Sequence, residues 1–302
     1  MAVQEHAATR TTGRKVLTTA QRRCAVGSDT ETPAERHILR PGATILLNWR
    51  RAHVLKAVHW LLISFGIGLL AGTFLLTNGT SPLFRFWAGI FLLGSEIAAI
   101  AAQQLARKTP FRSSHVEIAG ALPPILIGAL FILGATRAAA SLEASLWIWL
   151  PGLAAGVSAV VQCAAFQAAR EQYEFAAGAG LASRRETLLE ISLRRNEAVV
   201  RGNKTEELIW RAYQDFRRMQ QHLAPPKPEG SADQFWRRNR NRISAWALLS
   251  RRMNFIWLAV AALTSAFWPD ALVAVFGGIA VAGNLILLLL LLAGWKTQPV
   301  HA

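Results

Sequence analysis

The sequence predicts an all-α integral membrane protein with about six transmembrane helices and a cytoplasmic helical insertion between the fourth and the fifth. Three observations support this fold class. Hydrophobic residues make up 52% of the 302-residue chain and charged residues only 17%, which is too apolar for an ordinary soluble protein. The apolar residues gather in long runs. The basic residues gather in alternate loops between those runs.

Six apolar runs are the candidate membrane spans. All but one are about 20 residues or longer, which is enough for a helix to cross a hydrocarbon core of about 30 Å. The spans should be helical because the bilayer interior has no water to hydrogen-bond exposed backbone groups. The fifth run is the shortest, so it includes flanking residues or lies in a locally thinned bilayer. The runs cover residues 57–77, 84–106, 116–136, 146–169, 253–268 and 271–295.

The formal net charge of +15 is distributed unevenly along the chain. Of the 33 Lys and Arg residues, all except Arg85 and Arg137 lie in termini and loops that six spans place on one side. Basic loops remain on the cytoplasmic side of a membrane. We therefore expect a multi-pass protein of the cell inner (cytoplasmic) membrane with both termini cytoplasmic. No nucleic-acid reader motif accompanies the positive charge, so we expect no nucleic-acid partner.

The runs and loops divide the chain into five segments. We expect residues 1–47 to be a disordered basic cytoplasmic tail, because they contain few large apolar side chains. Residues 48–170 form a four-helix membrane segment, and residues 253–295 form a two-helix membrane hairpin. The cytoplasmic helical insertion, which ends in an interfacial helix, covers residues 171–252. Residues 296–302 form a cytoplasmic tail.

The first span carries Gly68 and Gly72, which lie four residues apart and therefore on one face of a helix. Small residues at this spacing allow the backbone of a neighbouring helix to approach closely. We therefore expect another span to pack directly over these two glycines.

Glu96 lies near the midpoint of the second span and is a candidate ion or proton site, together with Gln162 and Asn284. A carboxylate in the bilayer is costly unless it is protonated, paired or hydrated. The alternative is a structural role, with a neutral Glu96 carboxyl hydrogen-bonded to Asn284, Gln162 or Ser158. Glu96 belongs to a stripe at helical spacing that consists of Gly89, Leu92, Glu96, Ala99 and Gln103.

Within the insertion, residues 181–223 predict two amphipathic helices separated at Gly202 and Asn203, which both tolerate a left-handed backbone. The second helix carries an apolar stripe of coiled-coil type. This stripe either packs within a local helical hairpin or binds another copy of the chain or a partner in a membrane complex. The stripe consists of Ile209, Ala212, Phe216, Met219 and Leu223.

Residues 231–252 combine arginines and tryptophans directly before a span, which is typical of a helix that lies on anionic lipid at the cytoplasmic interface. Ser231 opens a capping-box pattern and should begin this helix. The four closely spaced arginines cannot share one face, so some should contact acids such as Glu206 or Asp215. The lipid-binding candidates are Arg237, Arg238, Arg240, Arg242, Trp236 and Trp246.

The sequence contains no recognisable catalytic constellation. It lacks the patterns of a phosphate-binding loop, a zinc-binding histidine pair and a nucleophile elbow. Its two cysteines, Cys24 and Cys163, have no second ligand at metal-binding spacing. We therefore expect a non-catalytic subunit or scaffold of a membrane complex, without a cofactor or a metal. The alternative is an ion channel or an ion-coupled transporter that uses Glu96.

Overall fold

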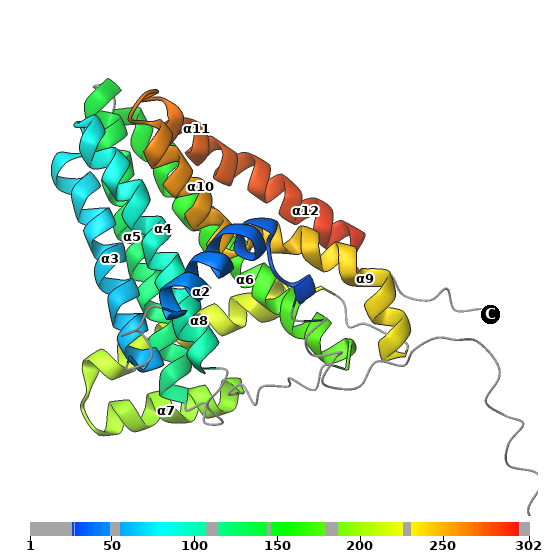
Figure 1. Cartoon of the computed structure of the whole chain (residues 1–302). Helices are drawn as coiled ribbons and strands as arrows, with labels where there is room; N and C mark the ends of the chain where they lie inside the picture. The colour runs from blue at the N-terminus through cyan, green and yellow to red at the C-terminus, as the bar shows by residue number, and fades with distance from the viewer. Residues whose placement is uncertain are drawn as a thin grey trace, which may run out of the picture.

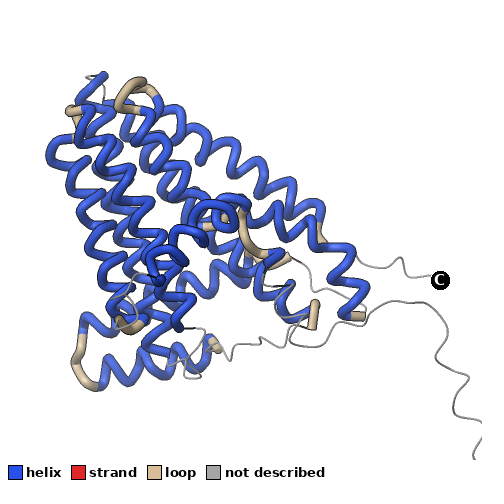
Figure 2. The backbone as a smooth tube through the Cα atoms, viewed as in Figure 1, coloured by secondary structure: helices blue, strands red, loops and turns tan. Residues whose placement is uncertain are grey.

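The computed structural model describes residues 26, 28–48, 55–106, 114–143, 146–178, 187–225 and 231–295. Helices make up 88% of these residues, and none of them lies in a β-strand (Figure 2). The prediction of an all-helical protein is therefore confirmed for the part of the chain that is described.

The bounds of the helices follow the predicted segments closely. The long helices are α3 (Ala57–Asn78), α4 (Pro82–Ala106), α5 (Ser114–Glu143), α6 (Trp149–Ala176) and a C-terminal helix made of α11 (Ala271–Gly277), the π-helical turn η5 (Gly278–Gly283) and α12 (Asn284–Ala293). The shorter helices are η1 (Glu35–Leu39), α2 (Arg40–Asn48), α7 (Leu188–Val200), α8 (Lys204–His222), α9 (Ala232–Trp246) and α10 (Arg251–Thr264). Two single 3-10 turns are η3 (Leu146–Ile148) and η4 (Ala247–Leu249).

Five helices among the described residues are long and apolar enough to span a membrane, namely α3, α4, α5, α6 and the combined α11–α12 helix. They correspond to five of the six predicted spans. The shortest predicted span, residues 253–268, coincides with α10. This helix has 14 residues. At 1.5 Å per residue it is about 21 Å long, which is less than the thickness of a hydrocarbon core.

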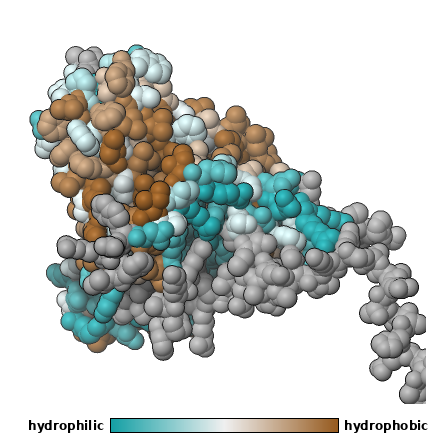
Figure 3. Space-filling model, in the orientation of Figure 1, coloured by the Kyte–Doolittle hydropathy of each residue, from teal (hydrophilic) through white to brown (hydrophobic). Residues whose placement is uncertain are grey.

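The long helices come together at one end of the molecule and spread apart toward the other (Figure 1). Helices α3, α4 and α5 lie next to one another, and the α3–α4, α5–α6 and α10–α11 connections all lie at one end. Helices α7, α8 and α9 lie away from that end, and we call the end near them the basic end. Hydrophobic residues gather over α3–α5 and α10–α12, whereas hydrophilic residues gather over α2, α7 and α9 (Figure 3). The apolar and the polar parts of the molecule are therefore separated along the helix axes.

The predicted glycine face packs as expected, with α5 directly over α3. A Cβ atom added to Gly68 would lie 2.5 Å from Ile127 Cδ1, and one added to Gly72 would lie 2.7 Å from Leu130 Cγ. Gly134 on α5 is equally close to α3, since its Cβ would lie 2.8 Å from the Gly72 carbonyl oxygen. The prediction that another long apolar helix packs over Gly68 and Gly72 is confirmed.

The N-terminal region differs from the expected disordered tail. Residues 35–48 form η1 and α2, and these helices pack against α4. Leu39 and Ala43 are completely buried in one cluster with Ala98 and Ala102 of α4. The expectation is therefore wrong for this segment, because its few apolar side chains are placed on one face that α4 covers. Residues 1–25 and the C-terminal tail lie outside the described residues.

Candidate functional site

Glu96 of α4 lies opposite the first two residues of α10. Its side chain is 3% exposed, and its carboxylate lies 3.9 Å from Arg251 Nη2 and 3.7 Å from Arg252 Nε. Two guanidinium groups, which stay charged at physiological pH, therefore offset the cost of burying this carboxylate. The hydrogen bonds to Asn284, Gln162 or Ser158 that a neutral Glu96 would make are not the contacts that the structure shows.

Arg252 extends this contact to the N-terminal helices. Its Nη1 donates to the Glu35 carboxylate of η1, and its Nη2 donates to the Gln103 side-chain oxygen of α4. The Arg252 and Glu35 side chains are only 13% and 11% exposed. We call Glu35, Glu96, Arg251 and Arg252 the ion-pair cluster. It connects η1, α4 and α10 near the basic end, so its first effect is to fix three elements relative to one another.

Two local features bring these side chains together. Ser250 begins α10 by accepting a hydrogen bond from the Met253 backbone nitrogen at 3.2 Å, which places the two arginines in the first turn. Gly89 allows α4 to touch α10, since a Cβ there would lie 2.7 Å from the Ala259 carbonyl oxygen. The predicted α4 stripe therefore faces α10. The positive end of the α10 dipole adds to the attraction for Glu96.

One oxygen of the Glu96 carboxylate can still accept a hydrogen bond. Glu96 Oε2 is buried and has no hydrogen-bond partner among the described groups, and the same holds for Arg251 Nε. The separations of 3.7 and 3.9 Å in the two ion pairs exceed the length of a direct hydrogen bond. Such a separation accommodates a bridging water between the carboxylate and a guanidinium group. Among the described residues, no group of His, Cys, Asp and Glu side chains could hold a metal ion.

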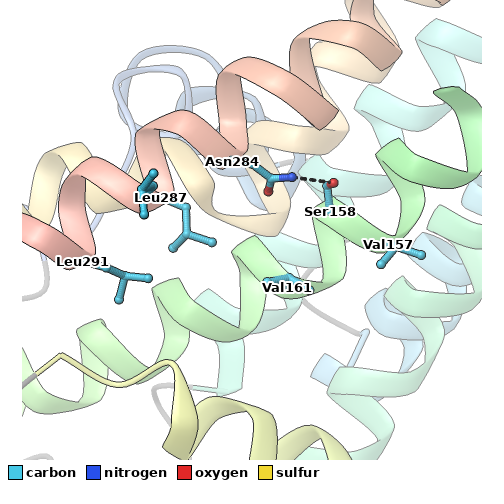
Figure 4. Close-up of a pocket in the computed structure, with 7 residues that line it drawn as sticks. Val157, Ser158, Val161, Asn284, Leu287 and Leu291 are labelled. Carbon is cyan, nitrogen blue, oxygen red and sulfur yellow. Dashed lines mark hydrogen bonds between the residues drawn. The ribbon is translucent and has the colours of Figure 1, made fainter.

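Gln162 and Asn284 form a separate polar network between α6 and the C-terminal helix. Gln162 Nε2 donates to the Ile279 carbonyl oxygen at 2.8 Å and to Asn284 Oδ1 at 3.1 Å. Asn284 Nδ2 in turn donates to Ser158 Oγ at 2.9 Å (Figure 4). Gly283 permits this approach, because a Cβ there would lie 2.4 Å from Gln162 Nε2. The structure brings these two candidates together and pairs Glu96 with arginines instead.

The lipid-binding candidates of α9 divide into two groups. Trp246 is 1% exposed, and the Trp236 indole donates to Asp29 Oδ2 at 2.8 Å, so both tryptophans are engaged within the protein. Arg242 Nη1 donates to the carbonyl oxygens of Ala293, at 2.9 Å, and Gly294 at the end of α12. Three candidates remain exposed on the surface, namely Arg237, Arg238 and Arg240.

The predicted contacts of these arginines with acids of the insertion are absent from the described residues. Glu206 pairs with Arg201 at 3.0 Å, and Asp215 pairs with Arg218 at 3.6 Å. Arg242 binds backbone carbonyl groups instead. The acids of α8 are therefore occupied by nearby arginines, and α9 keeps its excess of positive charge.

The α7–α8 hairpin forms at the predicted break but buries a different face of α8 from the one expected. Gly202 has a φ of +67°, and the Asn203 side chain caps α8. Trp210, Gln214 and Gln220 are buried, whereas the predicted apolar stripe is only partly covered and its Ala212 is exposed. The apolar stripe does not mark the buried face of α8, because α8 packs on α6 through polar contacts. These include a 2.7 Å hydrogen bond from Gln220 Nε2 to Gln167 Oε1.

Two acidic residues that make important contacts in the structure belong to no recognisable pattern in the sequence. Asp29 accepts hydrogen bonds from the Tyr173 hydroxyl at 2.9 Å and from Trp236, so it attaches the N-terminal segment to α6 and α9. Glu35 completes the ion-pair cluster from the same segment. Both acids lie in a region that reads as a solvated basic tail. Only their rarity among many arginines distinguishes them in the sequence.

No protein-family model, curated protein or solved structure matches this chain.

Proposed function

We propose that this protein is a non-catalytic, multi-pass subunit of a complex in the inner membrane, where it holds a partner protein through its cytoplasmic insertion. The observation that carries this proposal is the outer face of α7, where three large apolar side chains are exposed. Leu189 is 70%, Leu193 54% and Val200 87% exposed to solvent. We call these three residues the outer α7 face.

The proposed orientation follows from where the charges lie. With α10 counted as a short sixth span, the termini and residues 171–252 lie on the side of the basic end. The excess of Lys and Arg in these segments favours the cytoplasm for that side. Helix α10 can be shorter than a typical span because its first turn pairs with Glu96 and because a locally thinned bilayer costs little.

Among the described residues, α7 packs chiefly on α8, which leaves the outer α7 face available to a partner. Ile191 and Ala198 of α7 are completely buried against Trp210 of α8. The three exposed residues lie on the opposite side of α7, since they are 2, 2 and 9 positions from Ile191. They cover about three turns of the helix, which suits one apolar face of a partner helix.

Co-purification from solubilised membranes tests this proposal. The full-length protein should retain a defined partner protein, and the double substitution Leu189→Ser with Leu193→Ser should release it while the protein stays folded. The matched control is Val199→Ser, since Val199 is 50% exposed on the same helix but lies next to the α8 contact. Retention of the same partner by the double variant, or a single species without any partner, would contradict the proposal.

The second candidate function is ion or proton transport past Glu96. Its specific support is the buried Glu96 Oε2 atom, which lacks a hydrogen bond among the described groups. The two arginine partners weigh against it, because they bind the carboxylate that a transported cation would need. Reconstituted protein should be compared with Glu96→Gln in a flux assay. Equal flux in both, or no flux in the unchanged protein, removes this alternative.

A further inference from the structure

A groove of about 330 Å³ opens between α6 and α12. Its volume falls in the range of about 300–1,000 Å³ that is usual for small-molecule sites. Figure 4 shows Leu287 and Leu291 of α12 beside Val161 of α6, with the Asn284–Ser158 hydrogen bond near one end. The groove is lined by Val157, Ser158, Val161, Asn284, Leu287, Leu288 and Leu291.

The lining of the groove is suited to a hydrocarbon chain. Five of its seven lining residues are valine or leucine. The two polar residues already have hydrogen-bond partners within the protein. Asn284 Nδ2 donates to Ser158 Oγ, and Asn284 Oδ1 accepts from Gln162. A polar ligand would therefore gain little from them. From Asn284 to Leu291 the groove follows α12 for about 10 Å.

The groove leads toward positive charge at the basic end. Leu291 lies two residues before Ala293, whose carbonyl oxygen accepts a hydrogen bond from Arg242 Nη1 at 2.9 Å. Among the described residues, the hydrogen bonds of Arg242 are donated by Nη1 alone. The N–H groups of Nε and Nη2 therefore remain available to a ligand. Arg238 lies four residues earlier on α9, which places it on the same helical face, and it is exposed.

We propose that the α6–α12 groove binds one acyl chain of an anionic phospholipid, whose phosphate contacts Arg238 and Arg242. The acyl chain covers leucine and valine side chains. The phosphate is matched by two cations, and a guanidinium binds phosphate oxygens through paired N–H donors. Helices α9 and α12 lie at the right of Figure 1 and α7 at the lower left, so this site does not depend on the partner protein proposed above.

Native mass spectrometry of the purified full-length protein tests the site, with dioleoyl phosphatidylglycerol as the anionic probe and dioleoyl phosphatidylcholine as the neutral one. The unchanged protein should retain one phosphatidylglycerol in preference to phosphatidylcholine. Leu288→Trp should fill the groove and abolish this retention. Leu289→Trp is the matched control, because Leu289 is 57% exposed, like Leu288 at 52%, but does not line the groove.

The headgroup contact is tested separately on α9. Arg238→Gln should weaken retention of phosphatidylglycerol about fivefold, and retention of phosphatidylcholine should not change. Arg237→Gln is the control, since Arg237 is exposed on another face of α9. Arg242 is left unchanged because it also holds the end of α12.

Three results would overturn the proposal. Retention of phosphatidylglycerol by Leu288→Trp would mean that the lipid does not enter the groove. An equal loss in Arg237→Gln and Arg238→Gln would indicate attraction to general surface charge. A shift from dimer to monomer in Leu288→Trp, with unchanged lipid retention, would assign the groove to a second copy of the chain.

Discussion

Arg85 donates two hydrogen bonds to the Ser265 carbonyl oxygen, one from Nε at 3.1 Å and one from Nη2 at 2.8 Å. Its Nη1 donates to the carbonyl oxygens of Gly79 at 3.0 Å and Thr80 at 2.8 Å. Gly79 and Ser265 are the C-caps of α3 and α10, so one guanidinium holds the ends of two helices together. The side chain is 2% exposed, and the negative ends of two helix dipoles offset its charge.

Replacing Arg85 by methionine should destabilise the protein strongly. The substitution leaves buried carbonyl groups without their donors, and hydrogen bonds to charged groups are the strong ones, so we expect a loss of about 3 kcal/mol in the free energy of unfolding. Thermal unfolding in detergent micelles measures this loss. Arg137→Met is the control, because Arg137 is exposed. Equal unfolding temperatures for both variants would show that Arg85 has no such role.

The features that the sequence predicted correctly depend on local patterns. Five helices that are long and apolar enough to span a membrane follow from the length of apolar runs. The packing of α3 on α5 follows from two glycines on one helical face, and the break between α7 and α8 follows from Gly202 and Asn203. Each of these signals lies within about one to six turns of helix, so the chain carries it without reference to its partners.

The features that the sequence did not predict depend on contacts between distant segments. From the sequence, Arg85 is expected to be an ordinary cation in a loop on the outer side. It is buried and caps two helices only because the ends of α3 and α10 lie close together. Glu96 was expected near Gln162, but the arginines that it contacts lie more than 150 residues away in sequence and follow a polar helix. Helical periodicity gives the face of a residue and does not identify what covers that face.

Gly134→Ala should destabilise the contact between α3 and α5. The added methyl group would lie 2.8 Å from the Gly72 carbonyl oxygen, which belongs to the backbone and cannot move aside. Overpacking of this kind costs about 1–3 kcal/mol, and the unfolding temperature in micelles should fall accordingly. Gly66→Ala is the control, because nothing lies within 4 Å of its Cβ position. A destabilisation that is equal at both sites would argue against close helix packing at Gly134.

A double-mutant cycle should detect coupling between Glu96 and Arg252. Each single substitution, Glu96→Gln and Arg252→Gln, leaves a buried charge without one partner, and the double variant removes both charges. We expect a coupling of about 1–3 kcal/mol in the free energy of unfolding. Arg218 gives the control cycle with Glu96, because its side chain is 57% exposed and pairs with Asp215. Additive effects in both cycles would contradict a direct interaction.

Asp29→Ala should loosen the N-terminal segment without unfolding the long helices. The substitution removes the hydrogen bonds that the Asp29 side chain accepts from Tyr173 and Trp236. The backbone amides of residues 35–48 should therefore exchange with deuterium faster than in the unchanged protein. Hydrogen exchange followed by mass spectrometry measures this change. Asp215→Ala is the control, since its side chain is 62% exposed on α8. Unchanged exchange in residues 35–48 would mean that Asp29 does not hold the segment.

Labelling of single cysteines in intact cells should determine the orientation of the chain. In a variant whose native cysteines are replaced by alanine, Thr80→Cys should react with a membrane-impermeant maleimide, because Thr80 is exposed in the α3–α4 connection. Ser231→Cys should react only after permeabilisation, since Ser231 is exposed directly before the arginines of α9 and basic segments stay in the cytoplasm. The two sites lie toward opposite ends of the molecule, so each serves as the control for the other. Labelling of Ser231→Cys in intact cells, with Thr80→Cys protected, would reverse the orientation and would move the outer α7 face to the other side of the membrane.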